Sequence, residues 1–143
     1  MLRVGTMSHR EAGGAMRKSA LAAMAAGMLV FGGAPALAGP WEDGMVAYNR
    51  GDYLPAIRLF RPLAEQGNPK AQAQIGTMYR KGEGTTPSLT RAFMWFSVAA
   101  KRGDAKAKAG LREVSKTMTP AEMLQAKAMA DACAASNYRA CEY

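Results

Sequence analysis

The chain has 143 residues, enough for one domain, and its 19 lysines and arginines outnumber 11 aspartates and glutamates, giving a formal net charge of +8. Its single histidine, His9, lies in a leader-like N-terminal segment, so the rest of the chain has none for a Ser–His pair, a proton relay or a His-ligated metal. A Walker phosphate loop is also missing. We therefore predict a non-enzyme with no catalytic residue, metal site or cofactor.

The N-terminal residues 1–38 are typical of an export signal. Arg17 and Lys18 precede an uncharged run that ends in "ALA", the small residues that a signal peptidase recognises. We expect cleavage after Ala38 and a periplasmic or secreted bacterial protein, which argues against nucleic acid as a partner. The alternative is an uncleaved leader that anchors the protein, because residues 19–38 approach the ~20 residues of a membrane span.

Residues 53–66 form the first strongly periodic segment, and Gly67 ends it. The apolar positions of this segment share one helical face: Ile57, Phe60, Leu63 and Ala64. Asn68 is a suitable N-cap, and Pro69 a suitable first residue, for a second helix over 69–81. The inner stripe of that helix consists of Gln72, Ile75, Gly76 and Tyr79.

The second half of the chain continues the helical pattern. A loop over 82–88 ends in a serine cap, and a helix over 91–102 follows, which Gly103 ends. Asp104 caps the next helix, and "TPAE" at 119–122 is a capping box that opens the last one.

Two cysteines, Cys133 and Cys141, lie near the C-terminus, and in an oxidising compartment we expect them to pair. Eight residues of unbroken helix span about 12 Å, beyond the ~7 Å limit between the α-carbons of a disulfide. If the cysteines pair, the last helix must therefore end between them, and Asn137 is a suitable stop.

The chain repeats itself: residues 59–76 align with residues 95–112 at a constant offset of 36. The matched pairs are Phe60 with Phe96, Ala64 with Ala100, Gly67 with Gly103, Ala71 with Ala107, and Ile75 with Leu111. A period of this size with helix–turn–helix content is typical of an α-solenoid. We predict an all-α fold, a short α-solenoid of antiparallel helix pairs, with the bulky "FMWF" segment in its core.

Three segments resemble a known family: "AYNRGDYLPAIRLFRPLAEQG", "GNPKAQAQIGTMYRKGEG" and "AFMWFSVAAKRGDAKA". They are similar to the Sel-one-like repeats (SLR), relatives of the tetratricopeptide repeat, over roughly residues 44–112. Thr85, Thr86 and Ser88 depart from the family pattern in the loop. The resemblance implies a binding scaffold of the bacterial envelope. We divide the chain into a signal peptide (1–38), the repeat region (39–118) and a C-terminal capping helix with a disulfide tail (119–143).

Binding is expected on the helix faces opposite the packing stripes. In stacked helix pairs the first helices line the concave surface. We predict a groove in which Met78 and Val114 form an exposed apolar strip, and the alternative is an ordinary solvated face. The candidate groove residues are Gln74, Thr77, Met78, Lys81, Glu113 and Val114.

The main functional prediction is a non-catalytic adaptor for an unidentified envelope protein, with self-association through the short repeat array as a further expectation. A second hypothesis is a cationic binder of an anionic envelope polymer through the basic residues of 91–116, although such a run is more often a solvated helix face. A third is a small envelope hydrolase that uses only carboxylates. The polymer hypothesis predicts affinity that falls steeply with salt.

Overall fold

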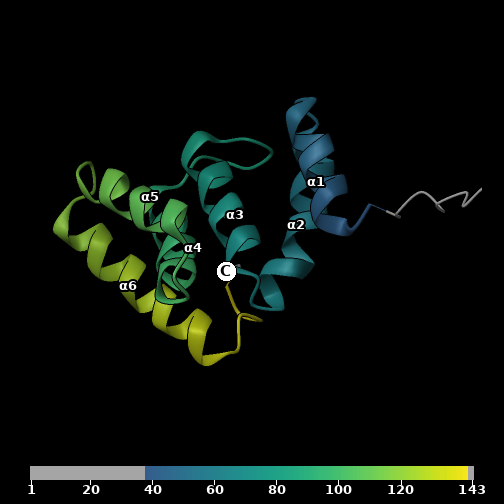
Figure 1. Ribbon diagram of the computed structural model, residues 1–143. Coiled ribbons are helices and arrows are strands. Elements are labelled where there is room, and N and C mark those ends of the chain that lie inside the picture. Colours follow the sequence, from purple (N-terminus) through teal and green to yellow (C-terminus); the bar gives the residue numbers. More distant parts are fainter. Residues whose placement is uncertain (1–37, 142–143) are drawn as a thin grey trace, which may run out of the picture. The chain divides into compact units, whose positions relative to one another are not determined.

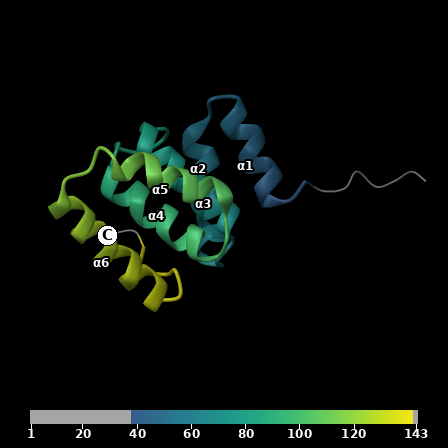
Figure 2. The ribbon, with the colours of Figure 1, turned by 60° about the vertical axis from the view of Figure 1, so that its left-hand side comes forward.

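The computed structural model describes residues 38–141, so the predicted leader lies outside the described residues except for Ala38. All regular structure in this part of the chain is helical (Figure 1 and Figure 2). The first five helices pack in chain order, and the sixth packs on the fourth. The prediction of an all-α repeat fold is confirmed. Within residues 38–141, no helix is long and apolar enough to cross a membrane. The helices are α1 (Pro40–Asn49), α2 (Tyr53–Glu65), α3 (Pro69–Lys81), α4 (Leu89–Lys101), α5 (Ala105–Ser115) and α6 (Pro120–Ala135).

The helix starts follow from their capping residues. Asn68 accepts hydrogen bonds from two backbone N–H groups of the first turn of α3, at 3.0 and 3.2 Å. Ser88 and Asp104 each accept one, at 3.2 and 2.7 Å, at the starts of α4 and α5. Thr119 and Glu122 form the predicted capping box of α6. Each cap stabilises its helix by about 1 kcal/mol, and the predicted capping residues are confirmed. Helix α4 begins directly after Ser88, two residues before the start predicted at 91.

Two glycines end equivalent helices of the repeat. Gly67 follows α2 with φ of 85°, and Gly103 follows α4 with φ of 92°. Only glycine adopts this left-handed region without steric cost, so these residues allow the chain to leave one helix and enter the next. The 36-residue offset therefore relates identical turns as well as identical faces.

The aromatic segment of α4 lies in the core, as predicted. Trp95 is fully buried and Phe96 is 1% exposed. Phe96 lies between two glycines of neighbouring helices: a Cβ placed on Gly76 of α3 would lie 2.7 Å from the Phe96 ring, and one on Gly110 of α5 would lie 2.6 Å from it. These distances are far below van der Waals contact, so the missing side chains make room for the ring.

Helix α6 packs chiefly against α4 and is tied to the C-terminal tail. It buries Ala126, Ala130 and Cys133. Cys133 forms a disulfide with Cys141, with a separation of 4.6 Å between the α-carbons. The helix ends at Ala135, before the second cysteine, as the predicted pairing requires.

Candidate functional site

The apolar strip predicted on the first helices is not exposed. Met78 is fully buried and Val114 is 1% exposed, so the prediction that they face a partner is wrong. Gln74 and Thr77 are buried as well, whereas Lys81 and Glu113 are exposed. The physical reason is that α3 is the middle helix of a short array. Because α2, α4 and α5 all pack against it, every residue from 71 to 79 is buried and no free face remains.

One pocket nevertheless brings three of the predicted groove residues together. Thr77, Lys81 and Glu113 line a cavity of about 250 Å³ whose walls come from α1, α3 and α5 and which Phe96 of α4 also lines. We call it the central pocket. Sequence reasoning missed its other polar residues: Tyr48, Arg80 and Lys106.

Two ion pairs hold the rim of the central pocket. Arg80 Nη1 lies 2.9 Å from Glu113 Oε2, which joins α3 to α5. Lys81 Nζ lies 3.4 Å from Glu83 Oε1, and Tyr48 donates its phenolic hydrogen to Glu83 Oε2 at 2.7 Å, which joins α1 to the loop after α3. Burial and the bond to Glu83 raise the pKa of Tyr48, so it remains a neutral donor at physiological pH.

Lys106 is the cation of this pocket that lacks an acidic partner. Its ammonium group donates to Gln74 Oε1 at 2.7 Å, in a partly buried hydrogen bond. Among the described residues no carboxylate lies within ion-pair distance of Lys106. Burial lowers the pKa of Lys106, Lys81 and Arg80 lower it further, and Asp104 opposes them. A neutral amide oxygen therefore compensates this charge only in part.

A second cavity, which we call the apolar groove, is lined by residues of α4, α5 and α6. Its volume is about 440 Å³, and the Lys101–Asp131 ion pair, at 3.2 Å, lies at one edge. Because α6 packs on α4 rather than closely on α5, a gap between α5 and α6 stays open. The apolar lining consists of Phe93, Ala100, Leu111 and Ala130.

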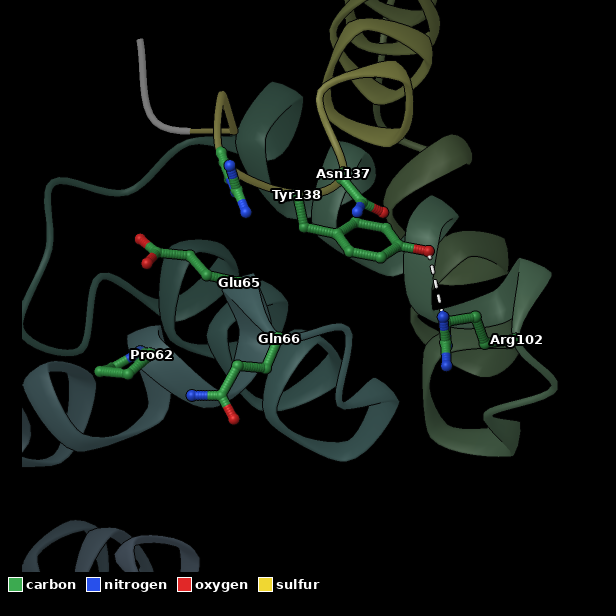
Figure 3. A pocket seen from close by; sticks show the side chains of 7 residues that line it. Pro62, Glu65, Gln66, Arg102, Asn137 and Tyr138 are labelled. Atoms are coloured by element: carbon green, nitrogen blue, oxygen red, sulfur yellow. Dashed lines mark hydrogen bonds between the residues drawn. The ribbon is translucent and has the colours of Figure 1, made fainter.

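A third cavity, of about 470 Å³, separates the C-terminal tail from the end of α2 (Figure 3). Arg102 donates to the Tyr138 hydroxyl at 3.3 Å, and its guanidinium lies 5.8 Å from the centre of the Tyr138 ring. These contacts hold the tail against the turn after α4. The lining is otherwise polar and open to solvent, and no sequence signal pointed to it.

Four of the basic residues of 91–116 lie at separate cavities. Arg91 contacts Tyr79 near the loop before α4, Lys101 pairs with Asp131, and Arg102 contacts the tail. Lys106 lies at the central pocket. These four basic side chains therefore do not share one cavity. Among the described residues, no cluster of three or more metal-ligating side chains occurs.

A family model agrees with this arrangement. The Sel1 repeat model matches residues 44–68 and 69–104. The second match spans α3, α4 and the turn that ends at Asp104, whereas the first begins inside α1 and includes α2. Helices α5 and α6 follow the matched segment and complete the array. Two Sel1 repeats therefore occupy residues 44–104 of the chain.

Proposed function

We propose that this protein is a non-catalytic scaffold that binds another protein of the bacterial envelope at the central pocket. The observation that carries the proposal is that α1 and α3, the first helices of the two repeats, line one preformed pocket together with α5. A site built on packed helices loses little conformational entropy when a partner binds. Repeat arrays use such surfaces for binding rather than for covalent chemistry.

The walls of the pocket are fixed before any partner arrives. The Phe96 ring lies between α3 and α5, where two glycines leave room for it, and the Arg80–Glu113 ion pair joins the same two helices. Tyr48 joins α1 to the loop after α3 through its bond to Glu83. These contacts support a pocket that is rigid rather than induced by the partner.

Export to an oxidising compartment forms part of the proposal. The Cys133–Cys141 disulfide supports it, since such bonds persist outside the reducing cytosol. The leader pattern of residues 1–38 points the same way.

Affinity capture from an envelope extract tests the proposal. The protein, purified after expression of the full chain, is compared with Ala109→Glu, which places a charged side chain in the pocket, and with Ala128→Glu, the same change on the exposed surface of α6. We expect a protein that the parent and Ala128→Glu retain and that Ala109→Glu loses. Equal retention by all three would rule out the central pocket. If modest salt then strips the material, the anionic-polymer hypothesis gains support.

A further inference from the structure

The central pocket carries one positive charge that its own acidic groups do not balance. Arg80 and Lys81 each pair with one carboxylate, those of Glu113 and Glu83. Lys106 is the third cation, and its hydrogen-bond partner is the amide oxygen of Gln74. The charges of Asp104 and Glu83 also act on Lys106, but from beyond ion-pair distance, so no carboxylate of the described residues contacts this third cation.

Lys106 is held in place for an incoming acceptor. An ammonium group has three hydrogen-bond donors, and Gln74 Oε1 takes one of them at 2.7 Å. Gln74 is buried and its Nε2 has no hydrogen-bond partner among the described residues, so packing and the bond to Lys106 position the amide oxygen. The remaining donors are available to an anion, and such charge-assisted hydrogen bonds are stronger than neutral ones.

The size and lining of the pocket limit what can bind there. At about 250 Å³ it is smaller than the roughly 300–1,000 Å³ of sites that enclose a whole small molecule. Phe96, Ala109 and Gly110 give it an apolar surface beside the cation. An aliphatic stem that ends in one carboxylate, such as a glutamate side chain, matches both features.

We propose that the central pocket binds a glutamate or aspartate side chain of an acidic segment of the partner protein, with its carboxylate on Lys106. This inference rests on the proposed scaffold function and adds the chemistry of the partner. Because one cation is unbalanced, one carboxylate satisfies the site, whereas a polyanion is not required.

The test is an NMR titration of the isotope-labelled protein with a tetraglutamate peptide blocked at both ends, beside the matching tetraglutamine peptide. We expect only the acidic peptide to shift the signals of Lys106, Gly110 and the Gln74 side-chain amide. Lys106→Gln should weaken binding about tenfold or more, as expected for a lost charge-assisted hydrogen bond. Lys106→Arg keeps the charge and should retain most of the affinity for the acidic peptide. That result would show that the loss of affinity in Lys106→Gln does not reflect unfolding.

Lys108→Gln is the matched control, because Lys108 lies on the same helix, is exposed as Lys106 is, and lies outside the central pocket. It should change the affinity by less than about twofold, since a charge outside the pocket makes no direct contact with the bound carboxylate and acts on it only through screened, longer-range attraction. Equal losses in Lys106→Gln and Lys108→Gln would overturn the inference in favour of general attraction to anions. Inorganic phosphate that binds at Lys106 as tightly as the peptide would also overturn it.

The two proposals fail in different ways. If Ala109→Glu loses the captured partner while Lys106→Gln keeps it, the scaffold function stands and the carboxylate inference is wrong. If the acidic peptide binds at Lys106 but no envelope protein is captured through the pocket, the inference about ligand chemistry stands and the scaffold function fails.

Discussion

The central pocket and the apolar groove are both lined by residues of α4 and α5, yet they differ in size and chemistry. Phe96 lines the first and Phe93, one turn earlier on α4, lines the second. On α5, Gly110 lines the central pocket and the next residue, Leu111, lines the apolar groove. Where glycine lets helices approach, the cavity is small and charged side chains reach across it. Where a leucine side chain stands at the crossing, the cavity is larger and apolar.

The difference shows how the end of a short repeat array departs from its middle. Helices α3 and α5 approach each other over Phe96, and the Arg80–Glu113 ion pair joins them. Helix α6 follows α5 in the chain but packs on α4, and the Cys133–Cys141 disulfide ties its end to the tail. The last helix thus covers the core without closing the groove beside it.

Replacing Phe96 or Phe93 with alanine should give the largest difference in stability between the central pocket and the apolar groove. We expect Phe96→Ala to lower the free energy of unfolding by about 3–5 kcal/mol, because the ring is enclosed between two helices. Phe93→Ala should cost roughly 1 kcal/mol less, because neighbours can relax into the adjacent groove. Urea unfolding of both variants measures the difference. A larger loss for Phe93→Ala would contradict the comparison.

Added bulk at the α3–α5 crossing should be poorly tolerated. A Cβ on Gly110 would lie 2.6 Å from the Phe96 ring, so Gly110→Ala should lower the free energy of unfolding by about 2 kcal/mol. Phe96→Leu in the same chain should recover part of that loss, because it removes the clash. The same unfolding experiment checks both variants, and an unchanged stability for Gly110→Ala would show that the helices are free to move apart.

A larger side chain in the apolar groove should raise the free energy of unfolding rather than lower it. Ser97 of α4 lines this groove, and Ser97→Leu should raise the free energy of unfolding by about 1 kcal/mol through burial of apolar surface. Ser97→Ala is the control that separates helix propensity from cavity filling. A melting temperature for Ser97→Leu below that of Ser97→Ala would mean that the groove does not accept an apolar side chain.

The smallest expected effect concerns the titration of the central pocket. Burial lowers the pKa of Lys106, and Lys81 and Arg80 lower it further while Asp104 and Glu83 raise it. Tyr48, once ionised, and Glu83 raise the pKa of Lys81. Side-chain NMR should therefore show Lys106 losing its proton at a lower pH than Lys81. A Lys106 pKa at or above the usual lysine value would contradict this account.

The sign of the associated stability change follows from the same shift. Because the folded-state pKa of Lys106 lies below its unfolded value, the charged side chain opposes folding. That opposition is present at low and neutral pH and is relieved as the pH rises through the folded-state pKa. A bound carboxylate should raise this pKa again and reduce the opposition.

The fold could be predicted from the sequence because the residues that begin and end the helices act locally. Asn68, Asp104 and Thr119 cap helices through contacts with their own first turns, and Gly67 and Gly103 end helices through their own backbone angles. The 36-residue offset then relates one helix pair to the next. The caps and the glycines act within a few residues, and the offset is visible in the sequence itself, so none of them requires knowledge of the tertiary structure.

The candidate site was predicted only in part, because it depends on contacts between helices. The face of α3 opposite its packing stripe is covered by further neighbours, which buries Met78. The repeat period matches Gln74 with Gly110, but the hydrogen-bond partner of Gln74 is Lys106, 32 residues away. A repeat offset identifies equivalent positions rather than contacting ones, so the role of Lys106 had no sequence signal.

The most direct test of the central claim is the affinity of the tetraglutamate peptide for three proteins: the parent, Ala109→Glu and Ser97→Leu. The first substitution places a carboxylate in the central pocket, and the second fills the apolar groove. We predict that Ala109→Glu weakens binding about tenfold or more, while Ser97→Leu leaves it unchanged. Binding that survives Ala109→Glu and is lost in Ser97→Leu would place the site in the groove and contradict the account.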